Sequence, residues 1–331
     1  RPVLAAIRLD GIARVVPTAP PAAARPVDGP GVYALSHAAY HADPCPEPSL
    51  SSTRLREMVT CSPLHAMLRH PRLGPGLDDP GSAAMDIGSA AHALLLGDER
   101  QLDIADFPDW RTNQAKLRRA AARAAGRVPL LSHAFATVQA MAAAARAQLD
   151  RQGFHALFRP GHGDAELALV WREGGPPAPS GAGRSVNGHA ASGGVWCRCR
   201  PDWLPRQRGP ALVLWDYKTT AVRTSALWMR LVLQRLRGDL QAGFYARGAR
   251  AVLGACEIRF RFVVQSVRPP FPLRVIDLPA PALARAEAEA GQGTALWARC
   301  LATGHWPAHP FRIVGPDLTM AGRAASAGHG R

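Results

Sequence analysis

The sequence predicts one α/β domain with a helical N-terminal lobe. Three observations support this class. Apolar residues recur at helical spacing as far as residue 153, short apolar stretches typical of strands follow, and helix and strand patterns then alternate to residue 303. Helices before and around a group of strands are typical of a sheet covered by helices. The chain of 331 residues is long enough for one large domain or two modest ones.

The N-terminal part of the chain is expected to be an arm followed by helices. Residues 1–48 are rich in Pro, Ala and Gly and have no clear period, which predicts an extended, partly disordered arm. Serine and proline then mark helix starts, because a serine oxygen can cap the first N–H groups and proline suits the first turn. The expected helices begin at Ser51 and at Ser62 and then cover residues 82–97, 112–126 and 130–153.

The C-terminal part is expected to contain most of the strands. Three apolar stretches, Ala165–Arg172, Val195–Leu204 and Ala211–Lys218, predict an antiparallel meander. Residues 174–194 consist largely of Gly, Pro, Ser and Ala and are expected to be a loop insertion, and residues 313–331 a disordered tail. Helices are further expected over 224–237, 238–253 and 280–303, and strands over Glu257–Val267 and Leu273–Leu278.

The charge of the chain is compatible with a polyanionic partner. The formal net charge is +15 and the pI is about 10.9. Phosphate contacts from Lys and Arg dominate the affinity of proteins for nucleic acid. An arginine-rich composition alone would give the same charge, so the charge permits nucleic-acid binding without identifying it.

The composition also bears on the compartment. No stretch of about 18 uncharged apolar residues is present, so no membrane span is expected. The sequence starts at Arg1 without a short apolar signal core, so secretion is not expected. The six cysteines form no C-x-x-C pair, which argues against structural zinc and fits a reducing compartment. These features predict a cytoplasmic protein.

One lysine stands out in a chain that uses arginine almost everywhere. Of 40 basic residues only Lys116 and Lys218 are lysines. An ammonium is a compact charge whose pKa can be lowered, whereas a guanidinium stays protonated. Lys218 therefore suggests a chemical requirement for an amine, although a single lysine can also occur by chance.

Asp202, Asp216 and Lys218 form the candidate active centre. Residues two apart on a strand share a face, so Asp216 and Lys218 point the same way, and a hairpin can bring Asp202 beside them. Two converging carboxylates repel unless a cation separates them, and oxygen ligands favour Mg²⁺ or Mn²⁺. The alternative is a surface Asp–Lys pair worth roughly 0–1 kcal/mol. The apolar run Ala211–Trp215 favours a buried strand instead.

Short motifs follow one another along the chain. They are Tyr40-His41-Ala42-Asp43, Ser49-Leu50-Ser51-Ser52, Ser62-Pro63, the G-x-x-x-H helix Ile87–Leu96, Arg200-Pro201-Asp202, Asp216-Tyr217-Lys218-Thr219-Thr220, Gln241-Ala242-Gly243-Phe244-Tyr245 and Gly304-His305-Trp306-Pro307. In this order they resemble the RecB/RecE branch of the PD-(D/E)XK nucleases, and the RecE-type (exonuclease VIII) enzymes in particular. The resemblance covers roughly residues 33–311, and its specificity lies in the order and spacing of the motifs.

The resemblance implies a fold and a role for each matching residue. Residues 49–312 would form a nuclease domain with a restriction-endonuclease-like core, in which helices flank a mixed central sheet. Asp202, Asp216 and His92 match metal ligands, Lys218 matches the catalytic lysine, and Glu166 matches a glutamate near the site. Gln241, Tyr245 and Arg200 are expected to contact DNA. By residue type alone, His92 is more often a packing residue and Glu166 a solvent-facing one.

The resemblance also implies an activity and partners. It implies a Mg²⁺-dependent exonuclease (Mn²⁺ being the other candidate ion) that digests double-stranded DNA 5′→3′. The 3′ single strands that it leaves would serve recombination or repair. A bacterial or phage-encoded homo-oligomer working with a single-strand annealing protein would fit. No iron–sulfur cluster is expected, because a downstream cysteine group is missing. The alternative is a catalytically inactive nuclease-like DNA-binding protein in a phage or repair complex.

Overall fold

The computed structural model describes residues 27–75, 83–174, 194–206, 211–221, 226–254 and 257–308. Residues 1–26 of the expected arm, 175–193 of the expected insertion and the whole expected tail lie outside the described residues. Among the helices of the described part, none combines the length and apolar character needed to cross a membrane.

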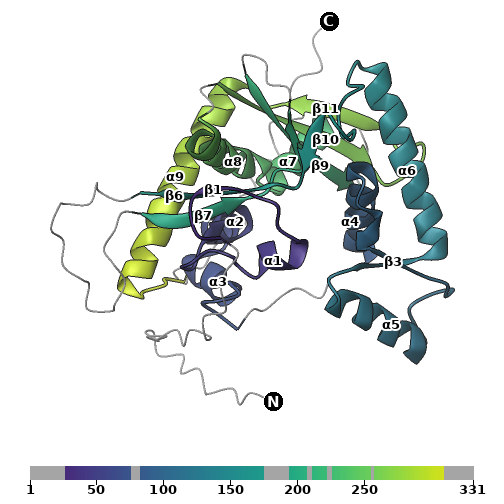
Figure 1. Cartoon of the computed structure of the whole chain (residues 1–331), viewed down its shortest axis with the longest axis horizontal. Coiled ribbons are helices and arrows are strands. Elements are labelled where there is room, and N and C mark those ends of the chain that lie inside the picture. The colour runs from purple at the N-terminus through teal and green to yellow at the C-terminus, as the bar shows by residue number, and fades with distance from the viewer. Residues whose placement is uncertain are drawn as a thin grey trace, which may run out of the picture.

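The strands form two main sheets and one small one, which confirms the α/β class (Figure 1). The strand orders are β1-β6-β7-β2, β11-β10-β9-β8-β5 and β3-β4. The five-stranded sheet is mixed, because β9 and β10 run parallel while its other pairs are antiparallel. The strands are β1 Gly31–Tyr33, β2 Leu50–Ser51, β3 Leu102–Ala105, β4 Val128–Leu131, β5 Gly163–Ala165, β6 Ala168–Glu173, β7 Val195–Cys199, β8 Trp203–Pro205, β9 Leu212–Thr220, β10 Ile258–Ser266 and β11 Leu273–Asp277.

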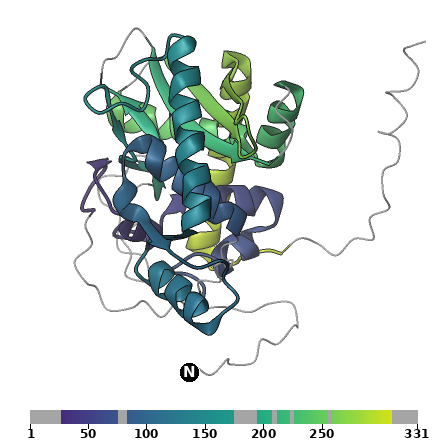
Figure 2. The same cartoon turned by 90° about the vertical axis from the view of Figure 1, so that its right-hand side faces the viewer.

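Helices cover the five-stranded sheet on both faces (Figures 1 and 2). Side chains of β9 alternate between them: Leu212 and Leu214 pack in the core with α8 and α9, whereas Trp215 and Tyr217 pack in the core with α4 and α6. The helices are α1 His37–His41, α2 Ser52–Thr60, α3 Pro63–Leu68, α4 Ala83–Leu96, α5 Asn113–Ala124, α6 Ser132–Arg151, α7 Ala226–Arg235, α8 Gly238–Leu253, α9 Ala280–Thr303 and the 3₁₀ helix η1 Glu99–Gln101.

The expected three-strand meander is wrong in its connectivity. Val195–Leu204 is not one strand: β7 pairs in the four-stranded sheet and β8 in the five-stranded one. Ala165–Arg172 is divided in the same way, with β5 and β6 in different sheets. Both of these stretches therefore cross from one sheet to the other. An alternation pattern cannot distinguish such a crossing from a continuous strand.

The expected arm is ordered where the structure describes it. Residues 27–48 contain β1, which pairs with β6, and α1, which buries Tyr40. Buried Asp43 accepts hydrogen bonds from Ser49 and pairs with Arg198 of β7 at 3.0 Å. A buried charge needs such a partner, so the pair fastens the segment to the sheet. The composition of the segment did not predict this order, because its few apolar residues pack against strands far away in the sequence.

A small unit between α4 and α6 was also missed. The strands β3 and β4 pair in parallel, with α5 as the connection between them. The helix expected over 130–153 starts later, at Ser132, because Val128–Leu131 forms β4. Stretches of four residues are too short for a periodicity argument to separate strand from helix.

A glycine sets how closely α8 approaches α9. A Cβ on Gly243 would lie 2.3 Å from the backbone carbon of Ala286, well inside contact distance. Gly243 is therefore required for the close crossing of α8 and α9. This crossing fixes the position of α8 and so of Gln241, two residues earlier on the helix. Gly291 of α9 is different, since a Cβ there would meet only the guanidinium end of Arg247, at 3.1 Å.

We expect Gly243→Ala to lower the free energy of unfolding by about 2 to 3 kcal/mol, because overpacking against backbone cannot be relieved by a rotamer change. Urea unfolding followed by tryptophan fluorescence measures this. The matched control is Gly291→Ala, in which the side chain of Arg247 can shift and alanine favours the helix. Equal stabilities of the two variants would contradict the close-approach argument.

Candidate active site

The site lies where the chain crosses between the two main sheets. One crossing is at Glu166, between β5 and β6, and the other is at Arg200–Asp202, between β7 and β8. The crossings are adjacent, since the N–H of Glu166 donates to the carbonyl of Asp202 at 3.2 Å. Glu166 has φ 53°, a left-handed conformation that is uncommon for a non-glycine residue. The crossings thus place two acidic residues side by side.

Asp202 is held by the backbone of the strand beside it. The strand β8 pairs with β9 only at Trp203 and Trp215. Beyond that pair, the N–H of Tyr217 donates to Oδ2 of Asp202 at 2.6 Å. A backbone donor on a strand edge needs a partner, and here a carboxylate supplies it. The hydrogen bond fixes Asp202 next to the residues that flank Tyr217.

Asp216 and Lys218 share one face of β9, as the strand period requires. The Lys218 ammonium forms an ion pair with Oδ1 of Asp216, and Gln241 of α8 donates to Oδ2 at 2.6 Å. Only 1% of the Asp216 surface is exposed. Gln241 therefore orients a buried carboxylate, and the structure places it on Asp216.

His92 reaches the site from α4. Its Nε2 lies 3.0 Å from Oδ1 of Asp202, and its Nδ1 lies 3.7 Å from Oε1 of Glu166. The helix can come this close to β9 because Gly88 has no side chain: a Cβ there would lie 2.8 Å from Oγ1 of Thr219. The glycine and the histidine of the G-x-x-x-H pattern thus have linked roles.

Arg200 lies beside Glu166 and an aromatic ring. Its Nη2 is 3.4 Å from Oε1 of Glu166, and its guanidinium lies 5.0 Å from the centroid of Tyr40. Gln101 donates to Oε2 of Glu166 at 3.4 Å. The contacts of Tyr40 and Gln101 with Arg200 and Glu166 could not be predicted from the sequence. Tyr40 was noticed only as part of a motif, and nothing in the sequence marks Gln101.

Tyr245 is a buried residue of α8. It is 5% exposed and packs edge-to-face on Phe260. This places its ring in the core beneath the site, because α8 turns that face toward the sheet. Its burial and ring contact give Tyr245 a packing role, and the DNA contact expected of it stays a prediction.

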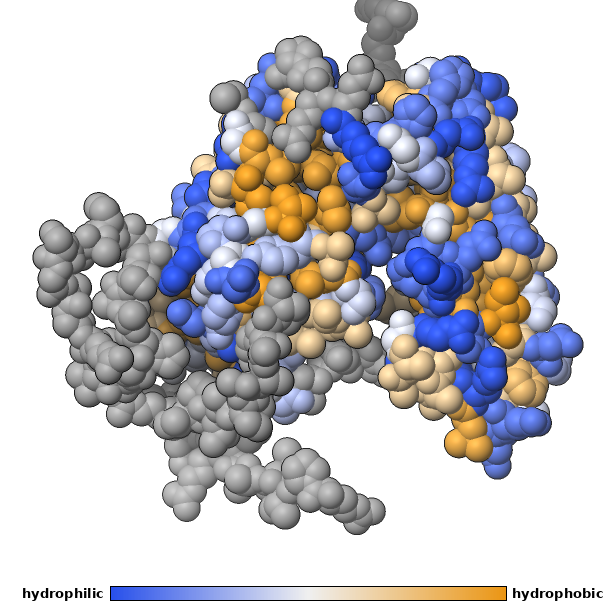
Figure 3. Space-filling model, in the orientation of Figure 1, coloured by the Kyte–Doolittle hydropathy of each residue, from blue (hydrophilic) through white to orange (hydrophobic). Residues whose placement is uncertain are grey.

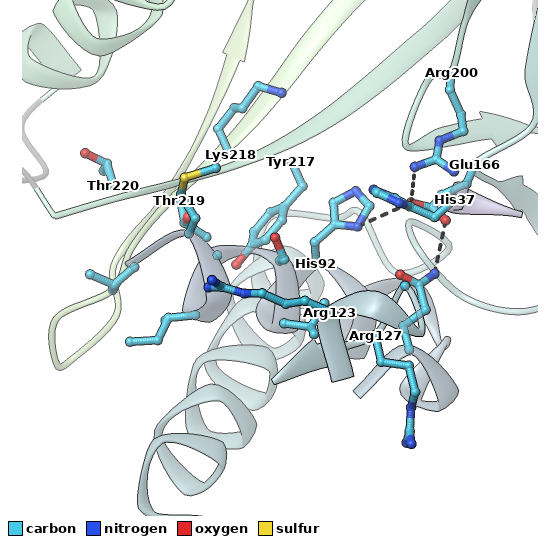
Figure 4. A pocket seen from close by; sticks show the side chains of 18 of the residues that line it. His37, His92, Arg123, Arg127, Glu166, Arg200, Tyr217, Lys218, Thr219 and Thr220 are labelled. Carbon is cyan, nitrogen blue, oxygen red and sulfur yellow. Dashed lines mark hydrogen bonds and ion pairs between the residues drawn. The ribbon is translucent and has the colours of Figure 1, made fainter. Parts of the chain in front are cut away.

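A cavity of about 900 Å³ opens over these residues. His92, Glu166, Arg200 and Lys218 line it together with His37 of α1 (Figure 4). Asp202 and Asp216 are not among the lining residues, but they are paired with His92 and Lys218, which are. A ligand in the cavity would meet these basic groups, Arg200 and the carboxylate of Glu166.

The two aspartates differ in acidity. Burial and the neighbouring charge of Asp202 raise the pKa of Asp216 to about 6. Burial would also raise the pKa of Asp202, but His92, Lys218 and the Tyr217 N–H outweigh it and lower the pKa. Carboxylates whose pKa values are pushed apart are a common feature of catalytic sites.

The pKa values of both basic groups are raised. Burial lowers the pKa of Lys218, but Asp216 and Asp202 raise it above the usual value. The same holds for the pKa of His92, which burial lowers and Asp202 raises, with help from Glu166. The lowered lysine pKa considered from the sequence is therefore not what this environment produces.

The donor set suits a divalent cation. Two carboxylates and one imidazole lie near one another here, with Oδ1 of Asp216 paired with the Lys218 ammonium and Oδ1 of Asp202 paired with His92. In the described ranges, no three His, Cys, Asp or Glu side chains converge closely enough to hold a metal ion. Oxygen-rich sites of this kind favour Mg²⁺ or Mn²⁺.

Comparison with known proteins gives a family match. Residues 49–312 match the model of the PD-(D/E)XK nuclease superfamily. No curated protein matches the chain significantly. A solved structure from Eubacterium rectale, described as a "Putative exonuclease", aligns with a TM-score of 0.54 and 12% identity over 89% of this chain and 99% of that chain. The structure of SSO0001 aligns with a TM-score of only 0.24 and 12% identity over 63% of this chain and 85% of that chain.

We expect Asp216→Asn to stabilise the metal-free protein. The folded pKa of about 6 lies above the ordinary value of 3.8, so stability present below pH 3.8 is lost as the pH rises through 6. That shift corresponds to about 3 kcal/mol and already includes the attraction of Lys218, so Asn should raise the free energy of unfolding by up to about 3 kcal/mol at neutral pH. Thermal unfolding in EDTA at neutral and acidic pH measures this.

Asp202→Asn is the matched control for that substitution. The pKa of Asp202 is lowered in the fold, so its charge contributes stability above the ordinary pKa. Its removal should destabilise the protein at neutral pH, opposite in sign to Asp216→Asn. Destabilisation of similar size by both variants would contradict the assignment.

Proposed function

The chain belongs to the PD-(D/E)XK nuclease superfamily, and from this premise we propose that it hydrolyses phosphodiester bonds of duplex DNA with a divalent cation. The observation that carries the proposal is the meeting of Asp202, Asp216 and Lys218 at the point where the sheets separate. The cavity above them is lined by basic groups, which suits a phosphate backbone.

The cation would be held by Asp202, Asp216 and His92, with Mg²⁺ as the first candidate and Mn²⁺ as the second. When bound, it would polarise a phosphate oxygen and lower the pKa of a water molecule. Tyr217 and Gln241 keep the two carboxylates in place through their hydrogen bonds.

Lys218 acts as a fixed positive charge in this proposal. Its raised pKa keeps it protonated at neutral pH, so it cannot serve as the base that takes a proton from water. An ammonium already in position stabilises the negative charge that develops on the phosphate in the transition state. In the absence of substrate, that charge is balanced by Asp216.

Glu166 and Arg200 position the site and the substrate. Glu166 lies between Arg200 and His92 and so holds both cations. The Arg200 guanidinium borders the cavity, where it can contact a DNA phosphate. Glu166 therefore contributes by fixing its neighbours.

The finer assignment is a RecE-like exonuclease that digests duplex DNA 5′→3′ and leaves 3′ single strands for recombination or repair. The order of the sequence motifs supports it, from Tyr40 to Pro307. The same resemblance extends the proposal to a homo-oligomer that encloses DNA and to a single-strand annealing protein as partner.

The second candidate is a DNA-binding protein without catalysis. One observation favours it: in the described structure the donor groups pair with one another, His92 with Asp202 and Lys218 with Asp216. Against it, a full set of donors is present, which a site that only binds DNA does not require.

We expect the purified protein to digest linear duplex DNA with Mg²⁺ and not with EDTA. A 5′ label should be released first and a 3′ label late, as seen in a time course on end-labelled duplexes. Asp216→Ala should abolish digestion, and Lys218→Met should slow it about 100- to 1000-fold, the usual effect of removing a charge-stabilising group. Arg285→Gln, on exposed α9 surface, is the control. Intact duplex in Mg²⁺ would sink the enzyme proposal.

We expect Mg²⁺ to raise the midpoint of thermal unfolding in the parent protein. A ligand at 100 times its dissociation constant stabilises the fold by about 2.7 kcal/mol. The increase should disappear in Asp216→Asn, because the variant lacks a donor carboxylate. A parent protein that binds duplex DNA but shows no response to Mg²⁺ or Mn²⁺ would favour the second candidate.

A further inference from the structure

A small unit made of β3, α5 and β4 projects from the lobe that carries α4 and α6 (Figures 1 and 2). Hydrophilic and apolar residues are interspersed over this lobe, which borders a hollow in the molecular surface (Figure 3). The catalytic proposal gives this unit no role. The helix of the unit, α5 (Asn113–Ala124), is rich in basic residues.

Four basic residues of the unit form a set that we call the α5 stripe. Lys116, Arg119 and Arg123 are spaced by three and four positions, so they share a helix face, and Arg127 follows just beyond the helix. Arg123 and Arg127 line the same cavity as Lys218 (Figure 4). The stripe is therefore continuous with the candidate active site.

One end of the stripe is anchored by a shared carboxylate. Asp86 of α4, which is 8% exposed, pairs with Arg119 at 2.7 Å and with Arg123 at 2.9 Å. A single arginine would satisfy this carboxylate in a bidentate pair. Both arginines attach α5 to α4, and the one carboxylate balances the charge of only one of them.

The other side of the unit repeats this arrangement. Asp103 of β3, which is 6% exposed, pairs with Arg118 at 2.9 Å and with Arg127 at 3.0 Å. Lys116 is exposed and forms no ion pair with any described residue. These five basic groups and two carboxylates together carry a formal charge of +3, so the unit presents a net positive charge.

We propose that the α5 stripe binds the backbone of duplex DNA outside the cleft, independently of sequence. The proposal rests on the proposed function, which makes DNA the substrate. Surplus cations beside a phosphate-binding cavity match the polyanionic continuation of a substrate that extends beyond it. A helix of 12 residues is about 18 Å long, enough to follow about five base pairs.

Lys116→Gln/Arg123→Gln tests the stripe without dismantling the unit. In this variant Arg119 still pairs with Asp86, and Arg118 and Arg127 still pair with Asp103. Each carboxylate therefore keeps at least one arginine partner. The matched control is Arg285→Gln/Arg299→Gln, which removes the same charge from exposed positions on α9. Thermal unfolding of both variants checks that the fold is intact.

Binding is measured by fluorescence anisotropy on a labelled duplex in EDTA, with salt between about 50 and 200 mM. Each phosphate contact adds about 0.9 to the slope of the logarithm of the binding constant against the logarithm of the salt concentration. Losing two contacts should therefore reduce this slope by about 2 and weaken binding about 30-fold at about 0.15 M salt. The control should retain the parent slope and affinity.

The outcomes separate the stripe from the catalytic proposal. A stripe variant with the parent slope and affinity overturns the stripe, whatever the digestion assay shows. An equal loss in the α9 control overturns it as well, because the effect would then come from net charge alone. A parent chain that binds duplex with the expected slope difference but digests none supports the stripe and fails the nuclease proposal. If the α5 stripe binds an acidic protein but does not bind duplex DNA, the proposal is also overturned.

Discussion

Two hydrogen bonds hold together the place where the sheets separate, and the site depends on them. The Glu166 N–H bonds the Asp202 carbonyl, and the Tyr217 N–H bonds the Asp202 carboxylate. Through them the backbone of one crossing fixes the other crossing and the edge of β9. Strand ends that diverge leave backbone groups unpaired, and such groups need partners. Here those partners include the acidic side chains that carry the chemistry, so fold and site share the same contacts.

The pKa values of the site follow from the close approach of Asp202 and Asp216. Asp202 has three partners that stabilise its negative charge, while Asp216 is buried beside it, and their acidities move apart. The fold thereby keeps two carboxylates within reach of each other at a cost in stability. Such a cost is typical of functional sites, because charges placed for chemistry are not placed for the stability of the fold.

The sequence was most informative where local pattern decides structure. The helices near 83–96, 238–253 and 280–303, and the strand carrying Asp216 and Lys218, follow from periodicity and turn residues. It was least informative where distant segments decide. The crossing at Glu166 and the place of Tyr40 depend on strands far away in the chain. The burial of Tyr245 could not be predicted, because a helical spacing shows that two residues share a face and not which way that face points.

The four-stranded sheet also constrains the order in which the molecule can be built. Its central strands β6 and β7 are flanked by β1 and β2, from the far N-terminal side of the chain. The hydrogen bond between Tyr40 and Arg198 joins positions 158 residues apart. Closing so long a loop costs entropy before the contact repays it. The ring of Tyr40 can therefore reach Arg200 only after the whole intervening segment has been synthesised, and the N-terminal segment cannot complete the cleft by itself.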